Sequence, residues 1–264
     1  MSIRELIDPA ALADVTLSHE EIKRYSRHLI MPEVGMSGQK KRKAASVLLI
    51  GAGGLGSPLA MYLAAAGVGQ LLLADGDRVD LSNLQRQIAH TTERLGQTKV
   101  GSAQHSLRAI NPEVEVECLD TRLEAEALQA QVERVDLVVD ASDNFPTRFA
   151  LNLACHRSGK PLVSGAAIRW EGQVAVFGGQ PGGPCYRCLY PEAGTEDTTC
   201  SENGILAPVA GIVGSIQATE AIKLLSLAGT PLLGRLLLVD ALRMEWRQFK
   251  VTPDPGCPVC SGER

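Results

Sequence analysis

The sequence predicts an α/β fold built on a mostly parallel sheet, and three observations carry this prediction. Residues 46–77 read as a buried strand, a glycine-rich turn, a helix and a second strand that ends in acidic residues. A further apolar run at 137–139 ends in acidic and amide residues, as a parallel strand does at the ligand-binding edge of a sheet. Two distant Cys-x-x-Cys motifs supply four thiolates. Together they indicate a Rossmann-like, mostly parallel sheet extended by antiparallel strands, with a structural zinc site.

The composition argues against a nucleic-acid-binding protein and against a membrane-spanning protein. A net charge of −4 argues against nonspecific nucleic-acid binding, which needs a basic surface. Residues 44–74 carry no charge, but glycines and Pro58 interrupt them, so a buried strand–helix–strand core fits better than a membrane span. Arg4, Glu5 and Asp8 break any apolar leader. Seven cysteines without an export signal indicate a reducing cytoplasm and metal or catalytic roles.

The glycine turn after the first strand predicts a nucleotide site. Gly51 allows the sharp turn, Gly53 lets a phosphate approach the backbone, and Gly56 lets the helix pack close to the strand. The helix N-terminus then presents free N–H groups to the phosphate. Asp75, at the end of the second strand, can accept hydrogen bonds from ribose hydroxyls. The alternative is a glycine-rich turn with a purely structural role.

The region before this strand is predicted to hold one helix. Residues 1–17 show weak periodicity and are expected to form a loose arm. Ser18 and Glu21 form a capping box that opens a helix through residues 20–30. Arg24, Arg27 and His28 share one side of it, and spacing alone favours a solvated basic face. Residues 40–43 are expected to lead into the strand.

Polar residues follow the second strand. Arg86 and Lys99 are candidate phosphate ligands at the carboxyl edge of the sheet, although either could be an ordinary surface charge. A helix is expected to end at Asn111-Pro112. A strand over 114–119 and a helix over 123–132 are predicted to follow.

The strand over 137–139 delivers Asp140, Asp143 and Asn144 to the same edge. A carboxylate beside a phosphate site needs a cation between them, so Asp143 is a candidate Mg²⁺ ligand. The alternative is that Asp143 is the N-cap of a helix that runs from about Pro146 to Ser158. Strands are predicted over 162–164, 173–177, 235–240 and 244–251, the last two as an antiparallel pair, and a buried helix is predicted between 204 and 229.

Cys185, Cys188, Cys257 and Cys260 are expected to form a closed four-thiolate Zn²⁺ site. Their wide separation means that the fold must bring the two pairs together. A closed shell leaves no open position, so this zinc is expected to be structural and to clamp the end of the chain onto the domain.

The complete set of motifs resembles the MoeB/ThiF family, bacterial relatives of the ubiquitin-activating enzymes. It comprises GAGGLG, LADGD, SNLQRQ, Lys99, DASDN, the two Cys-x-x-Cys pairs and a loop cysteine. The resemblance runs from RYSRHLI to CPVC, and SGAAIRWEGQVAVF is more similar to the MoeB branch than to the ThiF branch. The chain ends soon after CPVC, so the rhodanese domain of some relatives is expected to be absent.

The resemblance implies adenylation of a small ubiquitin-like sulfur carrier. The C-terminal Gly-Gly carboxylate of a carrier, MoaD-like or alternatively ThiS-like, would attack MgATP, release pyrophosphate and be ready for thiocarboxylate formation. ATP, Mg²⁺ and Zn²⁺ are the implied cofactors. The implied partners are the carrier, a second copy of this chain in a homodimer, and a cysteine desulfurase or rhodanese as sulfur donor, without nucleic acid or membrane.

The resemblance also assigns residues. The implied catalytic residues are Asp143, Arg86, Lys99, Arg27 and Cys200. The implied nucleotide-binding residues are Gly51, Gly53, Gly54, Gly56, Asp75, Asp77, Ser82, Asn83, Arg86, Lys99, Asp143 and Asn144. Arg27 matches an arginine that reaches the partner subunit's ATP site, which replaces the interpretation of a solvated face.

Cys200 matches a loop cysteine that links covalently to the carrier in some members and is dispensable in others. Neighbouring Glu196, Asp197 and Glu202 would raise the pKa of its thiol, which disfavours a reactive thiolate, so its requirement stays open.

The expected organisation is a single domain over 1–264. It contains an N-terminal helical region at 18–43, a nucleotide-binding half at 46–165, and a carrier-binding and zinc half at 166–264. Two alternatives stay open: an NAD-dependent oxidoreductase, motivated by the glycine fingerprint with Asp75, and a non-catalytic binder of a ubiquitin-like protein.

Overall fold

The computed structural model describes residues 5–180, 182–190 and 204–261. Its eight strands form one sheet in the order β3-β2-β1-β4-β5-β6-β7-β8, parallel from β3 to β5 and antiparallel from β5 to β8. The strands are β1 (Ser46–Ile50), β2 (Gln70–Ala74), β3 (Glu115–Leu119), β4 (Leu137–Asp140), β5 (Leu162–Ile168), β6 (Glu171–Phe177), β7 (Arg235–Asp240) and β8 (Glu245–Lys250). The predicted fold class is confirmed.

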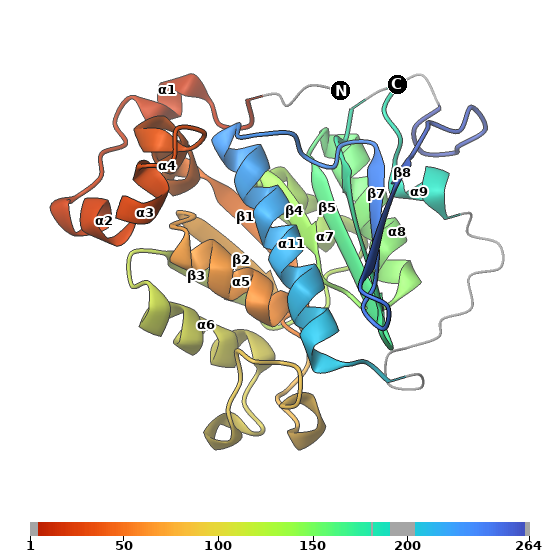
Figure 1. The fold of residues 1–264 in the computed structure, drawn as a ribbon, viewed down its shortest axis with the longest axis horizontal. Helices are drawn as coiled ribbons and strands as arrows, with labels where there is room; N and C mark the ends of the chain where they lie inside the picture. Colours follow the sequence, from red (N-terminus) through yellow and green to blue (C-terminus); the bar gives the residue numbers. More distant parts are fainter. Residues whose placement is uncertain (1–4, 181, 191–203, 262–264) are drawn as a thin grey trace.

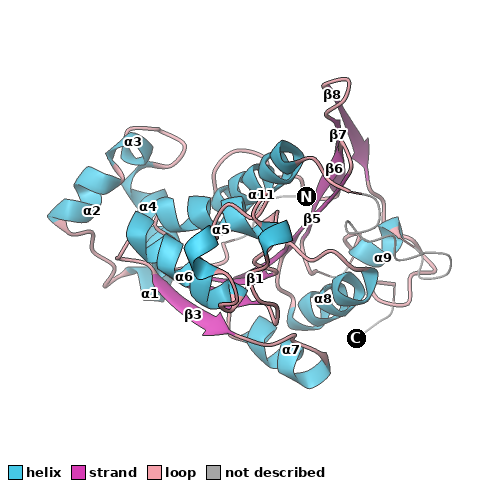
Figure 2. Cartoon of the chain, turned by 90° about the horizontal axis from the view of Figure 1, so that it is seen from below, coloured by secondary structure: helices cyan, strands magenta, loops and turns pink. Residues whose placement is uncertain are grey.

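Helices cover both faces of the sheet. Figure 1 shows α5, α6 and α11 in front of it and α7 and α8 behind it, and Figure 2 shows the same layers from below. The helices are α1 (Pro9–Leu12), α2 (His19–Arg24), α3 (Ser26–Leu29), α4 (Gly35–Ala44), α5 (Gly56–Ala65), α6 (Lys99–Ile110), α7 (Ala125–Glu133), α8 (Phe145–Ser158), α9 (Tyr186–Leu189) and α11 (Ala207–Ser226), with the short 3₁₀ turns η1 (Leu81–Asn83) and η2 (Thr92–Arg94). None of these described helices is both long and apolar enough to cross a membrane.

The uncharged run at 44–74 becomes β1, α5 and β2, as predicted. Successive side chains of a strand point to opposite faces, so a strand covered on both sides needs apolar residues throughout. Val47 and Leu49 of β1 pack into the core shared with α5, α6 and α11. Leu48 and Ile50 pack into the second core, with α7 and α8. The continuous apolar sequence is therefore the requirement of a central strand.

The order of the strands creates the ligand-binding edge. From β1 the chain crosses to β2 and then to β3, and it returns to β4 on the other side of β1. The connections after β1 and β4 therefore diverge at the carboxyl ends of these two strands. Open parallel sheets bind ligands in the crevice at such a switch point.

The N-terminal region differs from the prediction. The capping box between Ser18 and Glu21 is present, but the expected single helix divides into α2 and α3 at Tyr25. The Tyr25 ring is buried, and its hydroxyl accepts a hydrogen bond of 2.8 Å from Asn111 Nδ2. This long-range packing overrides the local helical pattern. The expected loose arm also contains the short helix α1, which Asp8 caps.

Residues 40–43 lead into β1 as expected, and they do so as the last turn of α4, a helix that was not predicted from the sequence. One other boundary was wrong. α11 ends at Ser226, where Leu227 takes a left-handed conformation, and not at Gly229. α8 ends as predicted at Ser158, and Gly159 caps it in a left-handed conformation with φ 62°.

Gly56→Ala should destabilise the fold, because a Cβ at Gly56 would lie 1.9 Å from the Gly51 carbonyl oxygen. We expect the free energy of unfolding to fall by about 3 kcal/mol in urea titrations. Gly211→Ala in α11 is the matched control, since a Cβ there meets nothing within 4 Å. It should gain up to about 1 kcal/mol from helix propensity. Equal stability of the two variants would contradict the packing role.

Candidate functional site

The glycine turn forms the floor of a cleft at the carboxyl edge of the sheet. Gly51 has φ +94°, and a Cβ there would lie 2.7 Å from the Ala141 carbonyl oxygen, so the position requires glycine. The cleft has a volume of about 500 Å³ and is also lined by Gly53 and Gly54. Gly56 lies behind the turn at the first position of α5. The backbone thus presents an open surface on which a phosphate can rest.

Asp75 fixes the turn and borders the cleft. One carboxylate oxygen accepts a hydrogen bond from the Ala52 N–H and the other accepts one from the Asp77 N–H, each at 2.8 Å. Each oxygen keeps a second lone pair that can accept a hydroxyl proton. The carboxylate is therefore held rigidly and can still bind a ribose.

Asp77 also lines the cleft and forms ion pairs with two cationic side chains. Its carboxylate lies 2.8 Å from the Lys99 ammonium and 3.1 Å from the Arg122 guanidinium. The Lys99 contact, helped by Arg122, lowers the pKa of Asp77. Lys99 is buried at the start of α6, and its ion pair with Asp77 fixes the position of its ammonium group. Arg122 was absent from the predicted site.

The SNLQRQ segment contributes only partly to the cleft. Arg86 lines it and donates to the Ser82 carbonyl oxygen at 3.1 Å. Ser82 and Asn83 are occupied by hydrogen bonds with Asp80 and lie outside the described wall of the cleft. Gln87, which the predicted site lacked, is buried in the wall, and its Oε1 has no hydrogen-bond partner among the described residues.

The segment after β4 brings Asp143 and Asn144 to the opposite wall. Asn144, not Asp143, is the N-cap of α8, because its Oδ1 accepts a 3.0 Å hydrogen bond from the Thr147 N–H. The alternative interpretation of Asp143 as the cap is therefore wrong. The exposed Asp143 carboxylate receives one long contact from Asn144 Nδ2, at 3.4 Å, and its remaining lone pairs can coordinate a cation.

A buried histidine supports the glycine turn from below. His90 Nε2 lies 2.9 Å from the Ala52 carbonyl oxygen, and Nδ1 lies 2.9 Å from Ser102 Oγ. Burial lowers the pKa of His90, which keeps the imidazole neutral. One ring nitrogen then donates while the other accepts. The sequence gives no signal for this role, because a lone histidine in a polar stretch carries no spacing information.

A second cleft, of about 450 Å³, opens beside the first and is lined by residues of β5, β6, β7, β8 and α8. The two clefts share Asp143, Arg148 and Ala167 as wall residues. Arg148 comes from the second turn of α8 and faces the fully buried Asp140. Burial alone would lower the pKa of Arg148, but Asp140, Tyr186 and Asp143 together raise it, so the guanidinium stays charged.

Arg27 is a predicted catalytic residue that does not reach this cleft. Arg27 is exposed on α3, which packs against α4, and α4 ends just before the amino end of β1. It therefore lies at the opposite edge of the sheet from the glycine turn (Figure 1). Cys200 lies outside the described residues.

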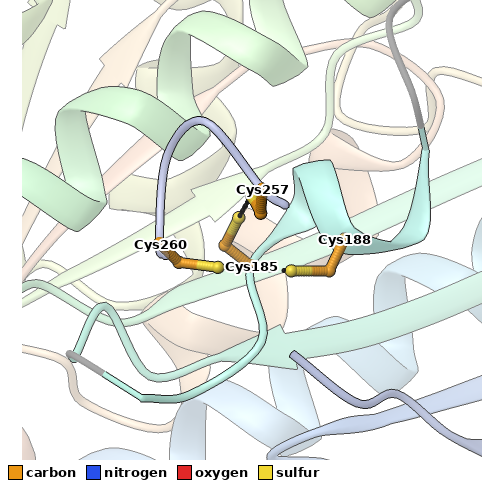
Figure 3. A group of neighbouring side chains, drawn as sticks. All are labelled: Cys185, Cys188, Cys257 and Cys260. Carbon is orange, nitrogen blue, oxygen red and sulfur yellow. Dashed lines mark hydrogen bonds between the residues drawn. The ribbon is translucent and has the colours of Figure 1, made fainter. Parts of the chain in front are cut away.

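The four predicted zinc ligands come together (Figure 3). The Sγ atoms of Cys185 and Cys257 are 3.6 Å apart, those of Cys188 and Cys260 are 3.3 Å apart, and all four lie within 4.8 Å of one another. A tetrahedron with Zn–S bonds of 2.3 Å has edges of about 3.8 Å. The spacing therefore fits Zn²⁺, and these distances are far beyond a disulfide bond.

Hydrogen bonds to sulfur tie the cluster to its surroundings. Asn152 Nδ2 donates to Cys185 Sγ at 3.5 Å, and the Asp254 N–H donates to Cys188 Sγ at 3.4 Å. The Asn152 Oδ1 also accepts a 2.8 Å hydrogen bond from the Tyr186 N–H. Asn152 belongs to α8, so the cysteine cluster is anchored to the helix that carries Arg148.

Comparisons with known proteins agree with this architecture. The model of the ThiF family matches residues 25–259. The sulfur carrier protein adenylyltransferase of Thermus thermophilus is 48% identical over 251 residues, which cover 92% of each chain. The molybdopterin-synthase adenylyltransferase of Escherichia coli is 46% identical, over 92% of this chain and 98% of the relative.

A solved structure of E. coli MccB with MccA-N7isoASN superimposes with a TM-score of 0.79 at 21% identity. The match covers 95% of this chain and 77% of the MccB chain, and it supports the fold. The family model matches most of this chain, and the two relatives are 46% and 48% identical to it. The chain therefore belongs to the ThiF family.

Proposed function

We propose that this protein is a nucleotidyltransferase that uses MgATP to adenylate the C-terminal Gly-Gly carboxylate of a small ubiquitin-like sulfur carrier. The main support for this proposal is that one cleft is lined by the glycine turn, Asp75, Arg86, Lys99 and Asp143. The names of the relatives, both adenylyltransferases, favour this activity over an NAD-dependent oxidoreductase and over a non-catalytic binder. A MoaD-like carrier is preferred and a ThiS-like carrier is the alternative.

The order of groups along the cleft suggests how ATP would lie. Asp75 would hold the ribose, the backbone of the glycine turn would face the α-phosphate, and Arg86 and Lys99 would offset phosphate charge. Mg²⁺ held by Asp143 would neutralise the triphosphate and assist the departure of pyrophosphate. Cations are needed because the attacking group and the substrate are both anions.

The second cleft suits the tail of the carrier. Ala166, Ala167 and Gly172 line it, so its walls leave room for a narrow chain such as Gly-Gly. Gly172 is required by packing against α11, because a Cβ there would lie 2.4 Å from the Val213 side chain. The second cleft joins the nucleotide cleft beside Asp143. A tail entering here would arrive next to the α-phosphate.

In the proposed reaction a tail carboxylate oxygen forms a bond to the α-phosphorus, and the bond from that phosphorus to the β-phosphate oxygen breaks. Pyrophosphate leaves with the bonding electrons, and the products are a carrier acyl-adenylate and pyrophosphate. A thiocarboxylate would form later with sulfur from a cysteine desulfurase or rhodanese. Cys200 is a candidate for a covalent carrier link, but nothing in the adenylation step requires it.

Carrier-dependent exchange tests the activity. Purified protein, a MoaD-like or ThiS-like carrier, MgATP and labelled pyrophosphate should yield labelled ATP, and a carrier lacking its last glycine should not support the exchange. Asp143→Asn should slow the exchange at least about 100-fold, because the Mg²⁺ ligand is lost. Its melting temperature should not change, since the carboxylate is exposed. Asp14→Asn, also exposed, is the control. Absence of exchange with every carrier would overturn the proposal.

We also propose a homodimer in which Arg27 completes the ATP site of the partner. Arg27→Ala and Asp143→Asn should each be inactive alone. In an equal mixture, half of the dimers are mixed and one of their two sites is intact, so activity should return to about a quarter of the wild-type value. If Arg27 acted within its own subunit, the mixture would stay inactive.

We further propose that Zn²⁺ occupies the four-cysteine cluster and stabilises the fold. Chelation or Cys257→Ser should release one zinc per chain, measured by atomic absorption. If zinc removal lowers the free energy of unfolding by about 3 kcal/mol, the melting temperature should fall by roughly 6–12 °C. Cys118→Ser, outside the cluster, should retain zinc. A melting temperature that is indifferent to metal removal would contradict the structural role.

A further inference from the structure

Arg148 occupies the junction of the two clefts. The described walls of the clefts have Asp143, Arg148 and Ala167 in common, and Arg148 is the cation of the three. Arg86 and Lys99 line only the nucleotide cleft. Arg148 is therefore placed where it can contact a group that extends from the second cleft into the first.

The guanidinium of Arg148 is only partly engaged by the protein. Arg148 is 8% exposed, and one of its terminal nitrogens donates to the Ser142 carbonyl oxygen at 2.9 Å. The buried Asp140 carboxylate and the Tyr186 hydroxyl lie close enough to raise the pKa of Arg148, but its Nε has no hydrogen-bond partner of normal geometry among the described residues. A buried donor without a partner costs free energy, and a ligand acceptor can recover it.

The orientation of the side chain is fixed. The guanidinium carbon lies 5.6 Å from the centre of the Phe145 ring, and the Ser142 contact holds the other side. A guanidinium held in this way presents a planar fork to an incoming carboxylate. Because each carboxylate oxygen has two lone pairs, the fork can hold the group while one lone pair stays free to attack.

The proposed reaction needs a cation at this place. The tail carboxylate must approach a triphosphate and pass Asp143, both of which repel it. Lys99 is paired with Asp77 and lies on the nucleotide side. Building on the proposed function, we infer that Arg148 binds the C-terminal carboxylate of the carrier tail and directs one of its oxygens toward the α-phosphate.

Peptide binding tests this role directly. The probe is a fluorescent peptide with the last residues of a MoaD-like carrier, ending in Gly-Gly as a free carboxylate or as its carboxamide. Fluorescence anisotropy with the full-length wild-type protein should show at least about tenfold tighter binding of the carboxylate form. Arg148→Gln should bind both peptides equally, and Arg148→Lys should keep part of the preference because it keeps the charge.

Arg42→Gln provides the matched control. Arg42 is 0% exposed, its Nε also lacks a partner among the described residues, and it lies outside both clefts. Its loss should lower the melting temperature but leave the preference for the carboxylate intact. A full carboxylate preference in Arg148→Gln would overturn the inference. Loss of the carboxylate preference in Arg42→Gln would also overturn the inference, because destabilisation alone would then explain the result for Arg148→Gln.

A wild-type complex gives a measurement that needs no variant. A crystal structure with a non-hydrolysable ATP analogue and the carboxylate peptide should place a nitrogen of Arg148 within about 3.2 Å of a tail carboxylate oxygen. A carboxylate bound by another cation would overturn the role of Arg148. Wild-type protein that binds neither peptide and lacks carrier-dependent exchange would overturn the proposed function itself, whereas an active wild type with an unchanged Arg148→Gln would reject only the Arg148 role.

Discussion

The close approach of α5 to β1 is the constraint on which the site depends. The Gly51 carbonyl occupies the space that a Cβ of Gly56 would need, at 1.9 Å, and Gly51 itself turns with φ +94°. This contact sets the start of α5 against the end of β1. Its neighbour Ala52 is then held from two sides, by Asp75 at the N–H and by His90 at the carbonyl. The backbone of the glycine turn is therefore held in place before any ligand binds.

The opposite wall depends on a different support. α8 begins at the Asn144 cap beside Asp143, carries Arg148 in its second turn, and reaches the cysteine cluster through Asn152. A metal that fixes four thiolates would hold the end of the chain against this helix. The knuckles lie 72 residues apart, so no local interaction could do the same. The four-cysteine cluster and one wall of the cleft thus depend on the same helix.

The elements that the sequence predicts well are those whose signals are local. The uncharged run at 44–74 specifies a strand, helix and strand because a central strand must be apolar on both faces. The Ser18 capping box forms as expected, but the following helix breaks at Tyr25, where the ring is buried and bonded to Asn111, 86 residues away. Such contacts have no counterpart in local periodicity. Arg148 is hidden for the same reason, since only the fold places this helical residue between two clefts.

The carboxylates of the cleft divide their tasks by what already binds them. Asp75 accepts two backbone N–H groups, and Asp77 holds Lys99 and Arg122. Among the described residues, Asp143 receives only the long 3.4 Å contact from Asn144. A divalent cation requires oxygen ligands with free lone pairs and a net negative charge. Asp143 offers both and is engaged neither by backbone N–H groups, as Asp75 is, nor by cations, as Asp77 is. The spacing of acidic residues in the sequence could not separate these three, because the difference lies in hydrogen bonds that only the folded chain assigns.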